Sequence, residues 1–384
     1  MYLRSITPVL ERFSKLYPAL GITGPRQSGK TTIAKTLFKH LPYVSLENID
    51  TRFQAQNDPR AFLANYQQGA IFDEVQHVPE LLSYLQEIAD EFPVKGRYVL
   101  TGSQNFALSH HVSQSLSGRI GMTTLLPLSL SELGMPINVN SAIFKGGYPG
   151  LHSLNMHPLD FYPSYIQTYI ERDVRQLKSI ENIGRFQTFL KLCAGRIGQI
   201  LNLSSFAQDC GISHTTVRQW LNILEASYLI FFLQPFHQSF NKRLIKMPKL
   251  YFYDTGLACT LLGLEKESQL ETHYLKGALF ENLIVLEIFK KRLNQGLPAN
   301  LYFWRDRTGH EIDLLAEWGG NIHAIEIKVG STLQSDFFKN VQYFCELSQT
   351  AKGYLIYTGQ QNGSHAKVKL VPINEIDQLT QLLG

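Results

Sequence analysis

Two sets of residues, far apart in the chain, have the types and spacing that chemistry on phosphate groups requires. The first is the segment GPRQSGKT at residues 24–31, which matches every fixed position of the pattern G-x-x-x-x-G-K-[ST]. Its glycines allow backbone N–H groups to curve around a phosphate, and a helix that follows adds its positive N-terminal end. We therefore predict that this segment binds the phosphates of a nucleotide.

The residue types assign roles within this predicted site. Lys30 would contact the β and γ phosphates, and the hydroxyl of Thr31 would bind Mg²⁺. The apolar run GAIFDEV, residues 69–75, ends in two acids. Asp73 would hold Mg²⁺ through water, and Glu74 would activate the attacking water, so ATP and Mg²⁺ are the predicted cofactors. The predicted ATP-binding residues are Gly24, Pro25, Arg26, Gln27, Ser28, Gly29, Lys30, Thr31 and Thr32.

A second apolar run, GRYVLTGSQNF at residues 96–106, has a polar end. Thr101, Ser103 and Gln104 are candidates to sense the γ-phosphate, with an ordinary surface turn as the alternative. Arg119 and Arg172 are candidates to stabilise charge at the nucleotide, within one subunit or across a subunit interface. The alternative for each arginine is a solvated or ion-paired side chain.

The second set of residues lies near the C-terminus. Glu281 is on a predicted helix, Asp313 on a predicted hairpin, and Glu326 and Lys328 alternate along the strand IHAIEIKV. Residues i and i+2 share one face of a strand about 7 Å apart, and Asp313 can meet Glu326 across paired strands. Carboxylates of this kind hold Mg²⁺ or Mn²⁺, which activates water, while a lysine stabilises developing charge. The alternative is an amphipathic strand whose polar face lies in water.

Between these two sets, the pattern predicts a helix-turn-helix. Phe206 and Ala207 lie on a short helix, Gly211 makes the turn, and Ser213 caps a second helix. The second helix can present His214, Thr215, Arg218 and Gln219 to a DNA groove, and a following β-hairpin would carry Lys242, Arg243, Lys246 and Lys249. The predicted DNA-binding residues are Arg218, Lys242, Arg243 and Lys246. The alternative is a winged helix that packs on the nucleotide domain or on a protein.

The composition is compatible with a folded protein of two or three domains. The chain has 384 residues, 44% hydrophobic and 18% charged, with a net charge of +4. The four cysteines are scattered without a C-x-x-C pair, which indicates neither a disulfide framework nor a zinc site. We find no signal peptide and no apolar run long enough to span a membrane, so a cytoplasmic protein is expected.

The motifs GPRQSGKTT, AIFDEVQ, LTGSQ, SLSGRI, GGYPG and YIERDV, followed by KLYFYDTGLA and GALFEN, occur in this order. Together they resemble a group of bacterial and archaeal AAA-type P-loop ATPases that end in a domain of unknown function. The resemblance implies an ATP-binding domain that assembles through subunit interfaces, so a homo-oligomer is expected. The set Glu281, Asp313, Glu326 and Lys328 resembles the PD-(D/E)XK nuclease fold, although no proline precedes Asp313.

The predicted fold class is α/β with three parts. Residues 1–150 form a P-loop AAA-type ATPase domain, residues 151–262 a helical and winged-helix region, and residues 263–384 a restriction-nuclease-like domain. The first hypothesis is an ATPase that acts on DNA, with a possible metal-dependent nuclease activity. The second is a nucleotide-dependent switch or scaffold that binds a protein partner and whose nuclease-like domain is inactive. A small-molecule kinase, the third, leaves the helix-turn-helix and the Glu-x-Lys strand unexplained.

Overall fold

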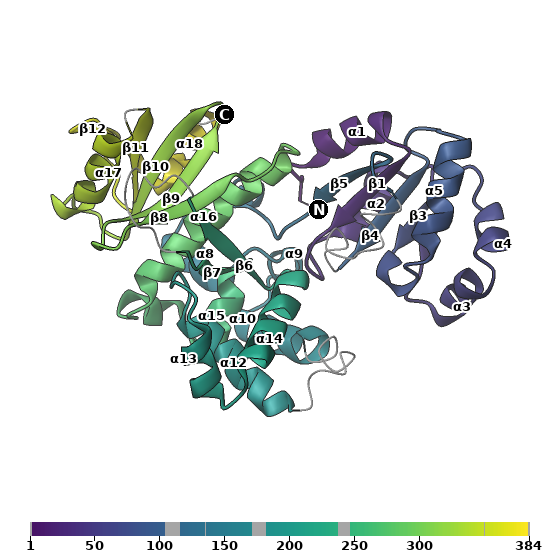
Figure 1. The fold of residues 1–384 in the computed structure, drawn as a ribbon, viewed down its shortest axis with the longest axis horizontal. Coiled ribbons are helices and arrows are strands. Elements are labelled where there is room, and N and C mark those ends of the chain that lie inside the picture. Colours follow the sequence, from purple (N-terminus) through teal and green to yellow (C-terminus); the bar gives the residue numbers. More distant parts are fainter. Residues whose placement is uncertain are drawn as a thin grey trace. The chain divides into compact units, whose positions relative to one another are not determined.

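The fold is taken from a computed structural model of the chain (Figure 1), which describes residues 2–103, 116–134, 136–170, 182–236, 246–348 and 350–382. The chain forms two compact units. Unit 1 comprises residues 1–128, 226–229 and 292–297, and unit 2 comprises residues 129–225, 230–291 and 298–384.

Unit 1 is built on a five-stranded parallel sheet with the strand order β2-β3-β4-β1-β5. Its elements are α1 (Thr7–Leu16), β1 (Ala19–Thr23), α2 (Lys30–Leu37), β2 (Tyr43–Ser45), α3 (Ile49–Asn57), α4 (Pro59–Ala64), β3 (Ala70–Asp73), a 3₁₀ turn (Val75–His77), α5 (Leu81–Glu91), β4 (Tyr98–Gly102) and β5 (Ile120–Thr124). The central strands β1, β3 and β4 are buried along their whole length, as expected of strands covered on both faces. Because the strands are parallel, the segments that follow them meet at one edge of the sheet.

Local sequence explains where the helices of unit 1 begin. The side chain of Asn48 accepts a hydrogen bond from Thr51 N and caps α3, and Asp58 caps α4 by accepting from Ala61 N. Helix α2 has no such side-chain cap and begins after Gly29, which adopts a left-handed conformation with φ of 96°. Its free N–H groups therefore face the loop at residues 24–29.

Unit 2 contains an eight-stranded mixed sheet with the strand order β12-β13-β11-β10-β9-β8-β6-β7. Its elements up to the sheet are α7 (Leu130–Leu133), α8 (Val139–Lys145), α9 (Pro149–Ser153), α10 (Pro158–Tyr165), a π-helical turn (Ile166–Ile170), α12 (Ile183–Gly195), α13 (Leu203–Cys210) and α14 (His214–Ala226). The remaining elements are β6 (Ile230–Pro235), β7 (Lys249–Phe252), α15 (Thr255–Leu261), a 3₁₀ turn (Glu267–Glu271), α16 (Lys276–Asn294), β8 (Leu301–Arg305), β9 (Glu311–Trp318), β10 (Asn321–Lys328), α17 (Asp336–Leu347), β11 (Ala351–Tyr357), β12 (Gly363–His365), β13 (Val368–Pro372), a 3₁₀ turn (Ile373–Glu375) and α18 (Ile376–Leu382).

The C-terminal half of unit 2 has the element order helix, three antiparallel strands, helix, parallel strand. Strands β8, β9 and β10 are antiparallel neighbours, and β11 pairs with β10 in parallel after α17. Helix α17 packs on β10 and β11 and buries Phe338, Val341 and Phe344 in the core of this sheet. Strands β6 and β7 pair with each other and join the same sheet through β6, which pairs with β8 at Gln234 and Pro235. The borders at residues 150 and 262 remain predictions.

The predicted helix-turn-helix is formed by α13 and α14. Gly211 ends α13 in a left-handed conformation with φ of 62°, and Ser213 Oγ accepts a hydrogen bond from Thr216 N at 3.1 Å. Both local predictions are therefore confirmed. Helix α12 packs on the pair through Phe186 and Phe189, whose rings contact Trp220 of α14.

Within the described parts of the chain, every helix is too short or too polar to cross a lipid bilayer.

Candidate nucleotide site and acidic cluster

The loop between β1 and α2 has the backbone conformation that the glycine positions were predicted to require. Gly24 has a φ of 143°, and a Cβ atom at this position would lie 2.2 Å from the carbonyl oxygen of Leu125. Gly29 is also left-handed. Arg4, which is not among the predicted ATP-binding residues, stabilises this loop, because its Nη1 donates to the carbonyl oxygen of Ser28 at 2.7 Å.

Lys30 is the buried cation of the site. The residue is 4% exposed, and Nζ donates to the carbonyl oxygens of Gly24 at 3.0 Å and Pro25 at 2.8 Å. Burial lowers the pKa of Lys30 to about 8, against the opposing charges of Glu74 and Asp73. The ammonium is thus held by weak neutral acceptors, which a phosphate can replace.

This pKa predicts a pH dependence of ATP affinity. Above pH 8 the unliganded protein loses the proton of Lys30, whereas a bound phosphate requires the ammonium. We expect the affinity for ATP to fall above pH 8, by up to about tenfold per pH unit, because binding then takes up one proton. Isothermal titration from pH 7 to 9.5, in buffers of different ionisation enthalpy, measures the affinity and the proton uptake together. A constant affinity without proton uptake would contradict the assignment of Lys30.

Asp73, at the end of β3, is the centre of a polar cluster. Its carboxylate accepts from Thr31 Oγ1 at 3.0 and 3.1 Å, from Tyr43 at 2.7 Å, and from the hydroxyl of Thr101. Thr31 and Asp73 therefore present hydroxyl and carboxylate oxygens side by side, which is the ligand chemistry that Mg²⁺ prefers. The residues present fit the predicted metal.

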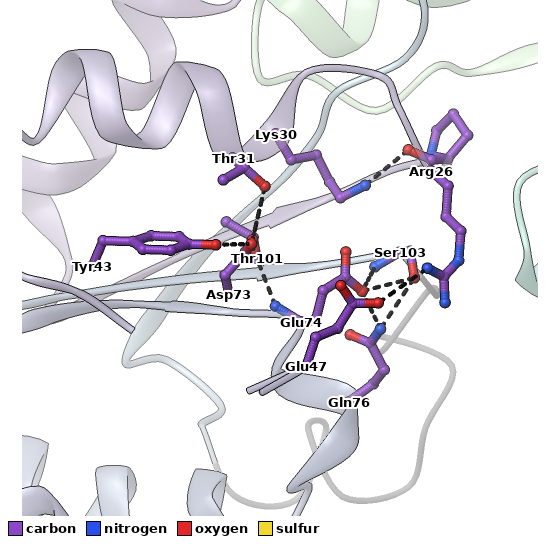
Figure 2. A network of polar contacts seen from close by, with 11 residues as sticks. Arg26, Lys30, Thr31, Tyr43, Glu47, Asp73, Glu74, Gln76, Thr101 and Ser103 are labelled. Atoms are coloured by element: carbon purple, nitrogen blue, oxygen red, sulfur yellow. Dashed lines mark hydrogen bonds and ion pairs between the residues drawn. The ribbon is translucent and has the colours of Figure 1, made fainter. Parts of the chain in front are cut away.

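Glu74 follows in a left-handed conformation, with φ of 57°. Its Oε2 accepts hydrogen bonds from Ser103 Oγ at 2.9 Å and from the side chain of Gln76 (Figure 2). Burial would raise the pKa of Glu74, but the charge of Lys30 and these hydrogen bonds outweigh it, so the pKa lies below the usual value. Glu74 is therefore an ionised carboxylate next to the loop, with one oxygen oriented by two neighbours.

The structure does not bring every predicted residue to this site. Arg119 precedes β5 and lies beside the beginning of β1, since its carbonyl oxygen accepts from Ala19 N. The loop follows the end of β1, and five strand residues span about 16 Å. Arg119 also pairs with Asp90. Within one chain it therefore lies at the opposite edge of the sheet, and a role across a subunit interface remains a prediction.

Two further predictions concern the sensors and the second arginine. Ser103 and Thr101 both contact the acids of the site. Gln104 and Arg172 lie outside the described residues. Arg26 forms an ion pair with Glu47 at 3.4 Å.

Tyr43 and Gln76 were not predicted. Gln76 belongs to the AIFDEVQ motif, so its place directly after the two acids was an available signal. Tyr43 lies 30 residues from Asp73 in sequence, and only the pairing of β2 with β3 brings them together.

In unit 2 the four predicted nuclease-like residues converge. The pairing of Ile325 with Leu314 places Glu326 next to Asp313 on neighbouring strands. Lys328 Nζ lies 2.6 Å from Glu326 Oε1 and 3.4 Å from Asp313 Oδ2, and Ile327 N donates to Asp313 at 2.9 Å. Glu326 is 2% exposed, so the polar face of the strand is buried rather than solvated.

Lys249 is a correction to the sequence analysis, which placed it among residues that would face DNA. It is 2% exposed, and Nζ contacts Glu281 Oε1 at 3.0 Å and Glu311 Oε1 at 2.5 Å. The reason is that β7 pairs with β6 and enters the large sheet, which directs this lysine inward. Tyr251, two residues further, also donates to Glu281.

Glu281, Glu311, Asp313 and Glu326 form an acidic cluster whose burial and charges shift the pKa values of Glu281, Glu326 and Lys249. Burial, and then the charge of Asp313, raise the pKa of Glu326 to about 8. Burial also raises the pKa of Glu281, against the charge of Lys249. Burial alone would lower the pKa of Lys249, but the charge of Glu281 outweighs it and holds that pKa well above its usual value. Among the described residues, no three His, Cys, Asp or Glu side chains are grouped as ligands for a metal ion.

The predicted DNA-facing side chains of α14 lie on its exposed surface: His214, Thr215, Arg218 and Gln219. The opposite face of α14 buries Val217, Trp220, Leu221 and Leu224. Lys246 is exposed, whereas Lys242 and Arg243 fall outside the described residues.

The sheet, the loop and the paired acids define a P-loop ATPase domain of AAA type. Residues 17–134 match the family model described as AAA domain. Residues 138–268 and 276–376 match two models described as domains of unknown function, DUF8612 and DUF4143.

The chain belongs to a family that includes two uncharacterized proteins, Rv2008c of Mycobacterium tuberculosis and Mb2031c of Mycobacterium bovis. Each is 30% identical over 325 residues, which cover 82% of this chain and 71% of the relative. The uncharacterized protein MJ1544 of Methanocaldococcus jannaschii is 25% identical over 342 residues, 80% of this chain and 73% of its own length. A solved structure, the Walker-type ATPase PABY2304 of Pyrococcus abyssi, aligns over 68% of this chain and 96% of its own with 14% identity and a TM-score of 0.47, too distant to define the fold.

Proposed function

We propose that this protein binds and hydrolyses ATP with Mg²⁺ and that its nucleotide cycle acts on DNA through unit 2. The observation that supports hydrolysis is the arrangement of Lys30, Thr31, Asp73 and Glu74 around one loop. A protein that only bound nucleotide would not need an ionised, oriented acid such as Glu74 beside the phosphate loop.

The positions of the site residues suit different steps of ATP binding and hydrolysis. The N–H groups of the loop and of the first turn of α2 bind the phosphates, and Lys30 leaves its carbonyl partners for them. Thr31 and Asp73 would hold Mg²⁺, which would neutralise phosphate charge. Glu74 orients the attacking water and accepts its proton. Ser103 and Gln76 keep Glu74 in place.

The direct test is phosphate release from ATP by the wild type and by Lys30→Ala. We expect Mg²⁺-dependent release by the wild type and none by the variant, whose folding is checked by circular dichroism. A wild type that neither binds nor hydrolyses ATP would overturn the proposal.

Support for action on DNA comes from α14 and from the segment that follows it. Arg218 and Gln219 are exposed one turn after the capped start of this helix, the position from which such helices contact bases. Tyr228, two residues after α14, belongs to unit 1 and donates to Thr23 Oγ1 at 2.8 Å, directly before the loop glycine Gly24. A conformational change of the loop at residues 24–29 can therefore be transmitted to α14 through the Tyr228–Thr23 hydrogen bond and the short segment that joins Tyr228 to the helix.

The contribution of α14 gives a second prediction. Arg218→Ala should weaken duplex DNA binding by about 1–3 kcal/mol if the guanidinium contacts a base. Lys191→Ala is the matched control, because Lys191 is an exposed cation of the same unit on α12. Fluorescence anisotropy at one fixed salt concentration measures both. Equal affinities for wild type and Arg218→Ala would exclude α14 as the contact surface and favour the switch that binds a protein partner.

We also propose a cytoplasmic homo-oligomer, in which Arg119 of one subunit would reach the nucleotide of the next. The proposed nuclease-like fold of the C-terminal half rests on its element order and on the convergence of Glu281, Asp313, Glu326 and Lys328.

A further inference from the structure

The acidic cluster of unit 2 has the carboxylates that a metal site of the proposed nuclease-like fold would use, but their arrangement does not fit a metal. Lys249 Nζ binds Glu281 and Glu311, and Lys328 Nζ binds Glu326 and Asp313. Each of the four acids therefore has one oxygen paired with an ammonium group, while the second oxygen of Glu326 is buried without a hydrogen-bond partner.

Strand pairing fixes the position of the Lys249 backbone, and burial restricts its side chain. Its backbone is in β7, paired with Leu233 of β6, and forms a further bridge with Ile200. Its side chain is 3% exposed and lies over the ring of Phe303 at 5.6 Å from the centroid. A buried ammonium in this position cannot swing into solvent to make room for a second cation without leaving buried carboxylates unpaired.

The charges of the cluster are already almost balanced. Three cations face the four acids, since Arg305 also pairs with Glu311 at 3.0 Å. A divalent ion would add two positive charges within a few ångströms of Lys249, in a region where solvent does not screen them.

We propose that Lys249 is the built-in counter-ion of the acidic cluster and that it excludes divalent metal ions from Glu281, Asp313 and Glu326. The acidic cluster then holds no metal ion with which to cleave DNA. This refines the proposed nuclease-like assignment and is independent of ATP hydrolysis.

Binding of Mn²⁺ in the absence of nucleotide and DNA, followed by electron paramagnetic resonance, tests this inference. The proteins compared are wild type, Lys249→Met, and Lys249→Met combined with Asp313→Asn. We expect no bound Mn²⁺ at the cluster of the wild type. Lys249→Met should bind Mn²⁺ at least about tenfold more tightly, because a nearby positive charge is removed. The added Asp313→Asn change should abolish that binding.

A second variant guards against loss of folding when Lys249 is replaced. Lys249→Met with Glu311→Gln removes one cation and one acid together, so the net charge of the cluster is unchanged and the other three carboxylates remain. Mn²⁺ bound by the wild type and lost in Asp313→Asn would overturn the inference. So would a folded Lys249→Met/Glu311→Gln variant that still fails to bind Mn²⁺. Neither result would bear on ATP hydrolysis, which is measured separately through Lys30→Ala.

Discussion

Replacing Glu74 with glutamine is expected to leave ATP binding intact and to lower its turnover by a factor of about 10² to 10⁴, the usual contribution of a general base. The amide has the size of the carboxylate, and Ser103 and Gln76 can still bind its oxygen. It cannot accept a proton from the attacking water, however. Binding of a fluorescent ATP analogue and phosphate release, measured on the same preparation, separate the two effects.

Glu91→Gln is the matched control for this substitution. Glu91 is an exposed acid at the end of α5, outside the site, so its replacement should change neither quantity. Turnover by Glu74→Gln close to that of the wild type would remove Glu74 from the reaction. Loss of ATP binding instead would make it a residue that shapes the site.

Asp254→Ala is expected to destabilise unit 2 by about 2–6 kcal/mol. Asp254 is buried at the start of α15 and accepts from Leu257 N at 2.9 Å, from Gly147 N at 2.8 Å and from Tyr162 at 2.7 Å. Alanine leaves the two backbone donors buried without partners, at a cost of about 1–3 kcal/mol each. Urea unfolding, followed by circular dichroism, measures the change.

The control for Asp254→Ala is the same substitution at Asp336, a solvent-exposed acid at a helix N-terminus. Asp336 begins α17, and its side chain is 71% exposed in its ion pair with Lys339. Asp336→Ala should therefore cost at most about 1 kcal/mol. Equal stabilities of Asp254→Ala and Asp336→Ala would show that the buried carboxylate does not hold residues 146–147 to α15.

The elements of both sites could be predicted from local sequence, because their signals lie within a few residues. The loop glycines, the acids at the end of β3 and the Ser213 cap of α14 are of this kind. The Glu-x-Lys alternation also predicted correctly that Asp313, Glu326 and Lys328 meet, since strand pairing needs only a neighbouring hairpin.

The partners of these residues could not be predicted, because they depend on the order of strands in the sheets. Tyr43 reaches Asp73 only through the pairing of β2 with β3. Lys249 is 32 residues from Glu281 in sequence, and the local pattern of basic residues assigns its strand to a separate hairpin. Once β6 pairs with β8, the same lysine faces a buried cluster of acids.

The most direct test of whether the ATPase cycle acts on DNA is the rate of ATP hydrolysis by the wild type. This rate is measured as duplex DNA is added at constant salt. We expect the rate to rise and saturate with DNA, and to be absent throughout in Lys30→Ala. A rate that is the same at every DNA concentration would contradict an ATPase that acts on DNA.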